Sequence, residues 1–236
     1  MLEVKNVSKK YPGSDKNAIE NINLIINEGD IYGFIGPNGA GKSTTIKAIV
    51  GIHSFEGDII FNNISIKEDP IKFKKELAYI PDNPVLYEHL SGIEYVNFIL
   101  NIYGVKNKNI DDIKKLSNMF SLGDKIYDPI SSYSHGMMQK ISIIAALSHN
   151  PKLLVLDEPF VGLDPKATFE LKETLKQLCE KEGLIVFFSS HVLDVVEKFC
   201  NKIAIIKNGA IIESGDTQVV KGEGSLEEKF MEIFNE

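Results

Sequence analysis

The chain has 236 residues, of which 43% are hydrophobic and 25% are charged, proportions typical of a soluble globular protein with a full core. A formal net charge of -7 argues against a general nucleic-acid or anionic-membrane binder, since both need a surplus of basic side chains. No apolar stretch is long enough to span a bilayer, and the N-terminal residues lack the apolar core of a secretory signal, so a cytoplasmic location is expected.

Apolar patterns in the first residues predict strands within 1–7, 23–26 and 30–35, the last of which ends in a glycine-rich turn. The spacing after this turn predicts a helix from Lys42 to about Val50. Further strands, separated by helical patterns, are predicted at Asp58–Phe61, Leu77–Ile80, Leu153–Leu156, Leu184–Phe188 and Ile203–Lys207. This alternation indicates an α/β fold with a largely parallel central sheet.

Residues 84–150 break the alternation, because their apolar side chains recur at helical spacing without a convincing strand. We therefore expect one domain over residues 1–236. Within it, residues 1–83 and 151–236 are expected to form an α/β core with a β subdomain, and residues 84–150 an inserted helical subdomain.

The C-terminal residues carry two local signals. Asn208 and Gly209 separate two apolar runs, which predicts a two-residue β-hairpin. Ser225 and Glu228 have the S-x-x-E spacing of a capping box and predict a last helix that ends at about Phe234.

A phosphate-binding loop is predicted between the third strand and the first helix, where the sequence reads GPNGAGKST. This stretch fits the pattern G-x-x-x-x-G-K-[ST] in the strand-then-helix context that the motif requires. Backbone N–H groups would converge on the phosphates, the Lys42 ammonium would reach the terminal phosphates, and the Ser43 hydroxyl would hold Mg²⁺. A glycine turn that binds nothing is the alternative. The candidate nucleotide-binding residues here are Gly36, Pro37, Asn38, Gly39, Ala40, Gly41, Lys42, Ser43 and Thr44.

A pair of acidic residues follows a buried strand in LLVLDEP. P-loop folds present carboxylates to metal and water at the carboxyl end of such a strand. We expect Asp157 to bind Mg²⁺, directly or through water, and Glu158 to act as general base toward the attacking water. The alternative for Glu158 is a structural role in the turn before Pro159.

These two motifs are shared by many ATPases and kinases, and three further stretches narrow the choice. YSHGMMQK begins a helical pattern before the acidic pair, and GLDP at 162–165 and SSH at 189–191 follow the pair. With them the chain resembles, over nearly its whole length, the nucleotide-binding subunit of ATP-binding cassette (ABC) transporters. The resemblance implies a P-loop NTPase (RecA-like) core with an N-terminal antiparallel β subdomain and an inserted α-helical subdomain. It also implies ATP and Mg²⁺ as cofactors, and ATP hydrolysis coupled to transport.

In that family two cassettes pair head to tail, so the resemblance implies a second cassette as partner, in a homodimer or a heterodimer. Ser134 and Gly136 would then complete the ATP site of the opposite subunit through hydrogen bonds and a helix N-terminus. All basic residues of this chain are lysines, so it cannot supply the arginine finger that other P-loop enzymes use. The signature of the second cassette would replace that finger.

Three more roles follow from the resemblance. Tyr11 matches the aromatic residue that stacks on adenine, although a surface tyrosine beside the Pro12-Gly13 turn is the alternative. Asp164 matches the acidic residue that crosses the dimer interface. His191 matches the histidine that contacts the γ-phosphate and orients the water.

Two departures from the family pattern are visible. The usual signature LSGGQ reads YSHGM here, with His135 in place of the first glycine. Asp82 stands where the family commonly has a glutamine that touches Mg²⁺ and senses the membrane subunit. A carboxylate there could reach the metal through water, and a plain turn residue is the alternative.

Both departures, together with EPFVGLDP, resemble the ABC-2-type exporter branch. That resemblance implies a polytopic membrane permease as second partner, docked near Asp82–Tyr103, and a peripheral position on the inner face of the cell membrane. No nucleic acid is expected as partner. The alternatives are a soluble ABC ATPase that is not coupled to transport, and a cassette that binds ATP without turnover.

Overall fold

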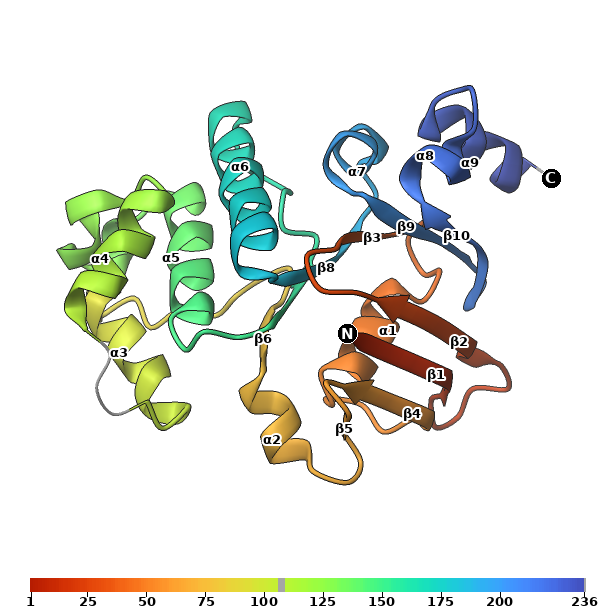
Figure 1. The fold of residues 1–236 in the computed structure, drawn as a ribbon, viewed down its shortest axis with the longest axis horizontal. Coiled ribbons are helices and arrows are strands. Elements are labelled where there is room, and N and C mark those ends of the chain that lie inside the picture. The colour runs from red at the N-terminus through yellow and green to blue at the C-terminus, as the bar shows by residue number, and fades with distance from the viewer. Residues whose placement is uncertain (106–108, 236) are drawn as a thin grey trace.

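The computed structural model describes residues 1–105 and 109–235 as an α/β protein (Figure 1), so the predicted fold class is confirmed. Its strands are β1 (Leu2–Lys10), β2 (Asn17–Ile26), β3 (Ile31–Ile35), β4 (Glu56–Phe61), β5 (Ile64–Ser65), β6 (Leu77–Ile80), β7 (Leu153–Asp157), β8 (Ile185–Ser190), β9 (Lys202–Lys207) and β10 (Ala210–Asp216). Its α-helices are α1 (Lys42–Ile49), α2 (Pro70–Lys75), α3 (Gly92–Ile102), α4 (Ile110–Met119), α5 (His135–Leu147), α6 (Pro165–Glu182), α7 (Leu193–Phe199), α8 (Thr217–Lys221) and α9 (Leu226–Asn235).

The strands form two sheets. The central sheet has the order β10-β9-β3-β8-β7-β6, and all its neighbouring strands are parallel except β9 and β10. The second sheet, of order β2-β1-β4-β5, is antiparallel. The order of the central sheet places β3 beside β8 and β8 beside β7, so that the loops after these three strands meet at one edge.

The two faces of the central sheet contribute to different cores. On β7, Leu154 and Leu156 pack into a core that also holds residues of α3, α5, α6 and α7, whereas Leu153 and Val155 pack into a core with α1 and the antiparallel sheet. The alternation follows from the two-residue period of a strand. Strands buried on both faces read as continuous apolar runs, and this explains sequences such as LLVL and IVFF.

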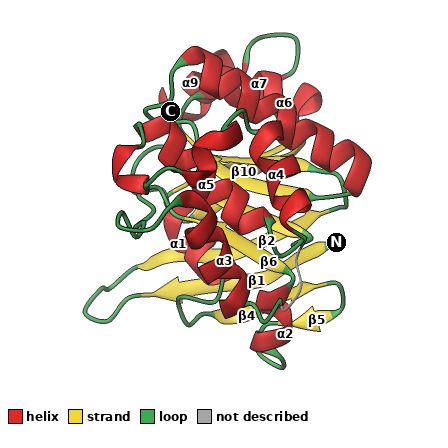
Figure 2. Ribbon diagram, turned by 90° about the vertical axis from the view of Figure 1, so that its left-hand side faces the viewer, coloured by secondary structure: helices red, strands yellow, loops and turns green. Residues whose placement is uncertain are grey.

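The segment between β6 and β7 is helical in the residues that the structure describes. Helices α3, α4 and α5 gather beside the central sheet, at the left in Figure 1, and face the viewer in Figure 2. Helix α3 begins with a capping box in which Ser91 accepts a hydrogen bond from the Glu94 amide and its own amide donates to the Glu94 carboxylate. Throughout residues 1–105 and 109–235, no helix combines the length and the hydropathy needed to cross a bilayer.

Both C-terminal signals of the sequence are confirmed. Asn208 and Gly209, with φ of 52° and 82°, connect β9 to the antiparallel β10, as a primed turn requires. The Ser225 amide donates to the Glu228 carboxylate over 2.9 Å, and the Glu228 amide donates to the Ser225 hydroxyl over 3.1 Å. Strand β5 and helix α2 are additions that the apolar patterns did not predict.

Candidate functional site

The loop from Gly36 to Gly41 connects β3 to α1 and has a backbone that only glycine fits at its two ends. A Cβ atom at Gly36 would lie 2.5 Å from the Ile206 carbonyl oxygen, and one at Gly41 would lie 2.7 Å from Ile19. Gly41 also has a φ of 113°, which side chains disfavour. The two glycines therefore let the loop run close against β9 and β2 before α1 begins.

Lys42, the first residue of α1, is buried and turns its side chain back over the loop. Its ammonium donates to the Gly36 carbonyl over 2.8 Å and to the Pro37 carbonyl over 3.2 Å. Burial lowers the pKa of Lys42, while the negative charges of Glu158 and Asp157 oppose that shift. The ammonium is thus held inside the loop and faces the two acidic residues across the cavity.

The acidic pair lies where β7 ends. Asp157 is the last residue of β7 and is 4% exposed. Glu158 follows it with a φ of 51°. One carboxylate oxygen of Glu158 lies 3.8 Å from the Lys42 ammonium, and the other lies 3.0 Å from Nδ1 of His191. This second oxygen, Oε2, is buried, and apart from the contact with His191 it has no hydrogen-bond partner among the described residues.

A cavity of about 310 Å³ brings the predicted loop and the acidic pair together. It is lined by Ala18, Asn38, Gly39, Gly41, Lys42, Ser43, Thr44, Asp82, Asp157 and Glu158. A wider neighbouring cleft of about 500 Å³ is lined by Asn38, Asp82, Asn83, His135, Glu158, Val161, Gly162 and His191. Of the predicted residues, Asn38, Asp82 and Glu158 line both spaces. The structure thus gathers one cation and three carboxylates around the phosphate loop.

Asp82 faces this site and also shapes the local turn. Its carboxylate accepts hydrogen bonds from the backbone amide and the side-chain amide of Asn83, over 2.9 and 3.2 Å. Burial, followed by the charges of Asp157 and Asp82, raises the pKa of the neighbouring Tyr79 to about 12. Tyr79 therefore stays neutral. Asp82 both stabilises the turn through Asn83 and lines the cavity.

Tyr11 lies just beyond the end of β1, beside the phosphate loop but outside the cavity wall. Its hydroxyl is 3.3 Å from the Thr44 hydroxyl, and its ring meets the edge of His53 with centroids 5.5 Å apart. The side chain is 37% exposed. The Lys9 ammonium lies over the ring, 5.6 Å from its centroid, and a partly exposed aromatic ring next to the loop can stack on a planar base.

Ser134 of the signature and Asp164 lie outside the cavity around Lys42, at exposed helix starts. Ser134 caps α5 by accepting a hydrogen bond from the Met137 amide over 3.3 Å, and Asp164 caps α6 by accepting one from the Ala167 amide over 2.9 Å. Ser134 is exposed and Asp164 is exposed in the free chain. Ser134, Gly136 and Asp164 do not line the cavity around Lys42, so the chain does not bring them together with its own phosphate loop.

His135, which replaces the first signature glycine, contacts the turn after the acidic pair. Its Nε2 atom lies 3.0 Å from the position that a Cβ of Gly162 would take. Gly162 has a φ of 76°, a conformation that side chains disfavour. The absence of a side chain at this position therefore allows the turn and also lets the His135 imidazole come close to it. The sequence alone did not indicate this contact.

Sequence reasoning also missed Ser189. Its hydroxyl lies between Asp157 and the backbone of Glu158. Ser189 is the first residue of the SSH stretch, two residues before His191. The sequence of this stretch does not indicate that the Ser189 side chain would contact the end of β7.

Comparisons with known proteins agree with this geometry. A family model described as "ABC transporter" matches residues 19–161. The lantibiotic transport ATP-binding protein SrtF of Streptococcus pyogenes is 35% identical over 98% of this chain and 96% of that protein. The methionine import ATP-binding protein MetN of Clostridium acetobutylicum is 34% identical over 92% of this chain and 69% of that protein.

A solved structure, the dimeric post-hydrolysis state of the ATP-binding cassette MJ0796 bound to ADP and Pi, matches with a TM-score of 0.81 and 26% identity, over 92% of this chain and 99% of the other. The fold, the geometry of the phosphate loop and the match to the family model together support one family assignment. The chain belongs to the ABC transporter family and is one of its ATP-binding ATPase subunits.

Proposed function

We propose that this ATPase subunit pairs head to tail with a second cassette and drives a membrane subunit of the ABC-2-type exporter branch. The observation that carries the proposal is the division of the predicted residues into two sets. Lys42, Asp157 and Glu158 converge on one cavity, whereas Ser134 and Asp164 lie at helix starts outside it. A second copy that turns its helix starts toward the cavity would join the two sets.

In this proposal the phosphate loop and Lys42 hold the triphosphate of ATP. The loop amides and the N-terminus of α1 favour an anion at this place. The Lys42 ammonium, now 3.8 Å from Glu158, would be drawn to the phosphate oxygens. Tyr11 would stack on adenine, and its contact with Thr44 would keep the ring beside the loop.

Mg²⁺ fits the oxygen donors of the same cavity. Ser43, Asp82 and Asp157 supply a hydroxyl and two carboxylates to one wall, and hard oxygen donors are those that Mg²⁺ prefers. Ser43 and Asp157 would hold the ion, with Asp82 acting through water. The bound ion would neutralise charge on the phosphates.

Glu158 would act as general base for hydrolysis. Its carboxylate takes a proton from water as the water oxygen bonds to the γ-phosphorus and the bond between that phosphorus and ADP breaks. The Glu158 carboxylate lines the cavity around Lys42, and its Oε2 atom lies 3.0 Å from Nδ1 of His191. His191 would orient the water and the γ-phosphate, and Ser134 and Gly136 of the second copy would stabilise the phosphate charge.

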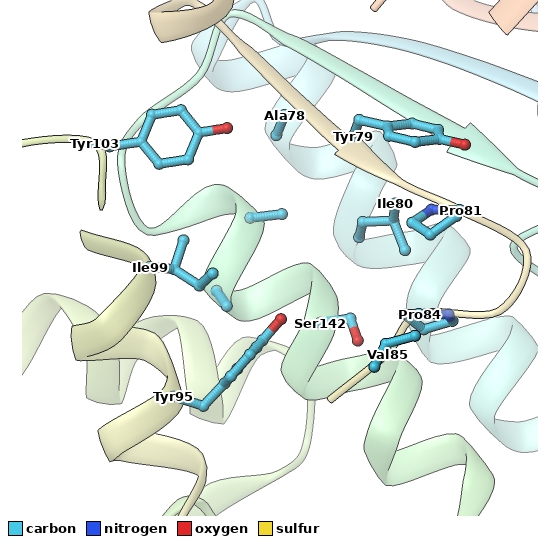
Figure 3. A pocket seen from close by; sticks show the side chains of 12 residues that line it. Ala78, Tyr79, Ile80, Pro81, Pro84, Val85, Tyr95, Ile99, Tyr103 and Ser142 are labelled. Carbon is cyan, nitrogen blue, oxygen red and sulfur yellow. The ribbon is translucent and has the colours of Figure 1, made fainter. Parts of the chain in front are cut away.

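The membrane subunit would dock in a groove of about 220 Å³ between β6, α3 and α5. Figure 3 shows Tyr95 and Ile99 of α3 facing Ser142 of α5, with Pro84 and Val85 at the rim. Val85 is 89% exposed, and Tyr87 on the adjoining surface is 47% exposed. An apolar helix of the permease would cover these side chains and hold the cassette at the inner face of the membrane.

The direction of transport rests on the motifs. The lantibiotic and methionine import relatives are 35% and 34% identical, so overall identity does not set the direction. The YSHGM signature and Asp82 match the exporter branch, and a relative named for lantibiotic transport fits a branch that moves peptides and drugs.

The proposal is tested by size-exclusion chromatography of Glu158→Gln with and without MgATP. Blocked hydrolysis should trap the closed pair, so a dimer is expected only with MgATP. Wild-type protein with MgATP is the control and should elute mainly as monomer, because hydrolysis reopens the pair. A persistent monomer of the variant would contradict pairing between identical subunits. Copurification of a polytopic membrane protein tests the transport role, and its absence would favour an ATPase that is not coupled to transport.

A further inference from the structure

The backbone of Glu158 adopts a conformation that glutamate rarely takes. Its φ of 51° lies in the left-handed region, where Cβ crowds the backbone. Local hydrogen bonding can favour asparagine or aspartate there, but glutamate has no such advantage. An outside contact must therefore hold the turn that follows β7.

Ser189 provides that contact from the neighbouring strand. Asp157 of β7 and Ser189 of β8 are direct partners in the parallel register. The Ser189 hydroxyl accepts a hydrogen bond from the Glu158 backbone amide over 3.1 Å and donates one to Oδ1 of Asp157 over 2.5 Å. Ser189 is fully buried, so water cannot substitute for either bond.

We propose that Ser189 is a positioning residue for ATP hydrolysis, which holds the Glu158 carboxylate toward the phosphate loop through the two hydrogen bonds of its hydroxyl. The Glu158 amide belongs to the peptide plane between Asp157 and Glu158, so its bond to Ser189 fixes that plane and the direction from which the Glu158 side chain leaves the backbone toward Lys42 and His191. The same hydroxyl donates its hydrogen bond to Oδ1 of Asp157, so that Oδ2 remains available to a group bound in the cavity. The inference rests on the proposed role of Glu158 as general base.

The test compares Ser189→Ala with Ser117→Ala in the full chain. Ser117 is also a buried serine, on α4, and its hydroxyl donates to the Gly123 carbonyl over 2.8 Å, so its variant loses the same chemical group far from the cavity. We expect Ser189→Ala to lower kcat for MgATP by about 10- to 100-fold, the range seen when an outer partner of a site residue is removed. The Kd for ATP measured without Mg²⁺ should change by less than about threefold, since the phosphate loop is untouched. Ser117→Ala should keep kcat within about twofold.

A double-mutant cycle separates positioning from a general structural effect. At saturating Mg²⁺, the Ser189→Ala change should not lower the residual rate of Glu158→Gln further, because its effect passes through the carboxylate that is already missing. Additive losses would overturn the proposal, and so would a Ser189→Ala protein that keeps full kcat. Ser189→Thr keeps the hydroxyl, so loss of activity in Ser189→Ala with recovery in Ser189→Thr supports the hydrogen bonds, whereas equal loss in both overturns them. If Glu158→Gln itself hydrolyses ATP at the wild-type rate, the general-base assignment fails instead.

Discussion

The phosphate loop and the signature helix start are both predicted to touch the same nucleotide phosphates, yet their surroundings differ. Lys42 is buried and makes two hydrogen bonds to its own loop, while Ser134 is exposed and bonds to the first turn of its helix. The first region joins one cation and three carboxylates in a single cavity of one chain. Ser134 and Gly136 of the second region do not line that cavity, although His135 between them lines the neighbouring cleft. In the proposed head-to-tail pair, the two regions of one chain would belong to two different sites.

Complementation between two inactive variants should give the largest effect. Glu158→Gln removes the proposed general base, a role worth about 10²–10⁴-fold in rate, and Ser134→Ala removes a proposed phosphate donor. We expect each variant alone to hydrolyse ATP poorly. In a head-to-tail pair of one subunit of each kind, one site carries both defects and the other carries none.

Mixing the two variants should therefore restore activity, measured as phosphate release against protein concentration. Free mixing and independent sites would give about a quarter of the wild-type rate, since half of the pairs are mixed and half of their sites intact. Mixing Glu158→Gln with Glu158→Gln,Ser134→Ala is the control and should restore nothing. If the mixture stays inactive while the mixed pair forms, Ser134 serves the site of its own chain and the comparison between the two regions is wrong.

A second, smaller effect is expected at the groove between β6, α3 and α5. Val85→Glu places a charge on an 89% exposed apolar side chain, where burial by a partner would desolvate it. We expect basal ATPase activity within about twofold of wild type and loss of binding to the membrane subunit, because desolvating the new carboxylate costs several kcal/mol. Copurification with the permease measures the binding.

Ile71→Glu is the matched control for that change. Ile71 is 71% exposed on α2, outside the residues that line the groove, so its variant should copurify normally. Loss of nucleotide binding by Val85→Glu would place this residue in the catalytic region instead of a docking surface.

The phosphate loop was predictable because its requirements are local. A few consecutive positions between a buried strand and a helix decide where the amides point, and glycine at 36 and 41 is required by the close approach of Ile206 and Ile19. The strands were predictable for a similar reason, since burial on both faces leaves continuous apolar runs. The hairpin was predictable from the Asn208-Gly209 pair, because both residues adopt the positive φ that this turn requires.

Ser189 was not predictable, because its role depends on the register between β7 and β8. The sequence shows that both strands exist, but a shift of one residue would turn Ser189 away from Asp157. Helix α2 was missed for another reason. It has six residues and one buried side chain, Phe73, too few for a periodic pattern. Asp69 as N-cap followed by Pro70 was the available signal.

The smallest effect is expected at Glu197, which links α7 to the C-terminal helix α9. A hydrogen bond from the Leu226 backbone amide, followed by one from Lys221, lowers the pKa of Glu197 below its ordinary value of 4.5. A carboxylate with a lowered pKa in the folded state stabilises the fold above its unfolded pKa, and this stability is lost as the pH falls through the folded pKa. The Glu197 side chain is 24% exposed, so solvent screening limits the gain to about 0.5–1 kcal/mol.

Glu197→Gln should therefore lower the midpoint of thermal unfolding by a few degrees at pH 7, and the gap to wild type should narrow as the pH falls below about 4. Glu180→Gln, at an exposed position on α6, is the control and should show little change at either pH. A gap that stays constant down to about pH 3 would mean that the substitution acts by weakening packing and not by removing a charge. Helix α7 directly follows the loop that carries His191. ATPase activity measured on the same variants therefore shows whether weakening the contact between α7 and α9 also affects the nucleotide site, or affects only the stability of the two helices.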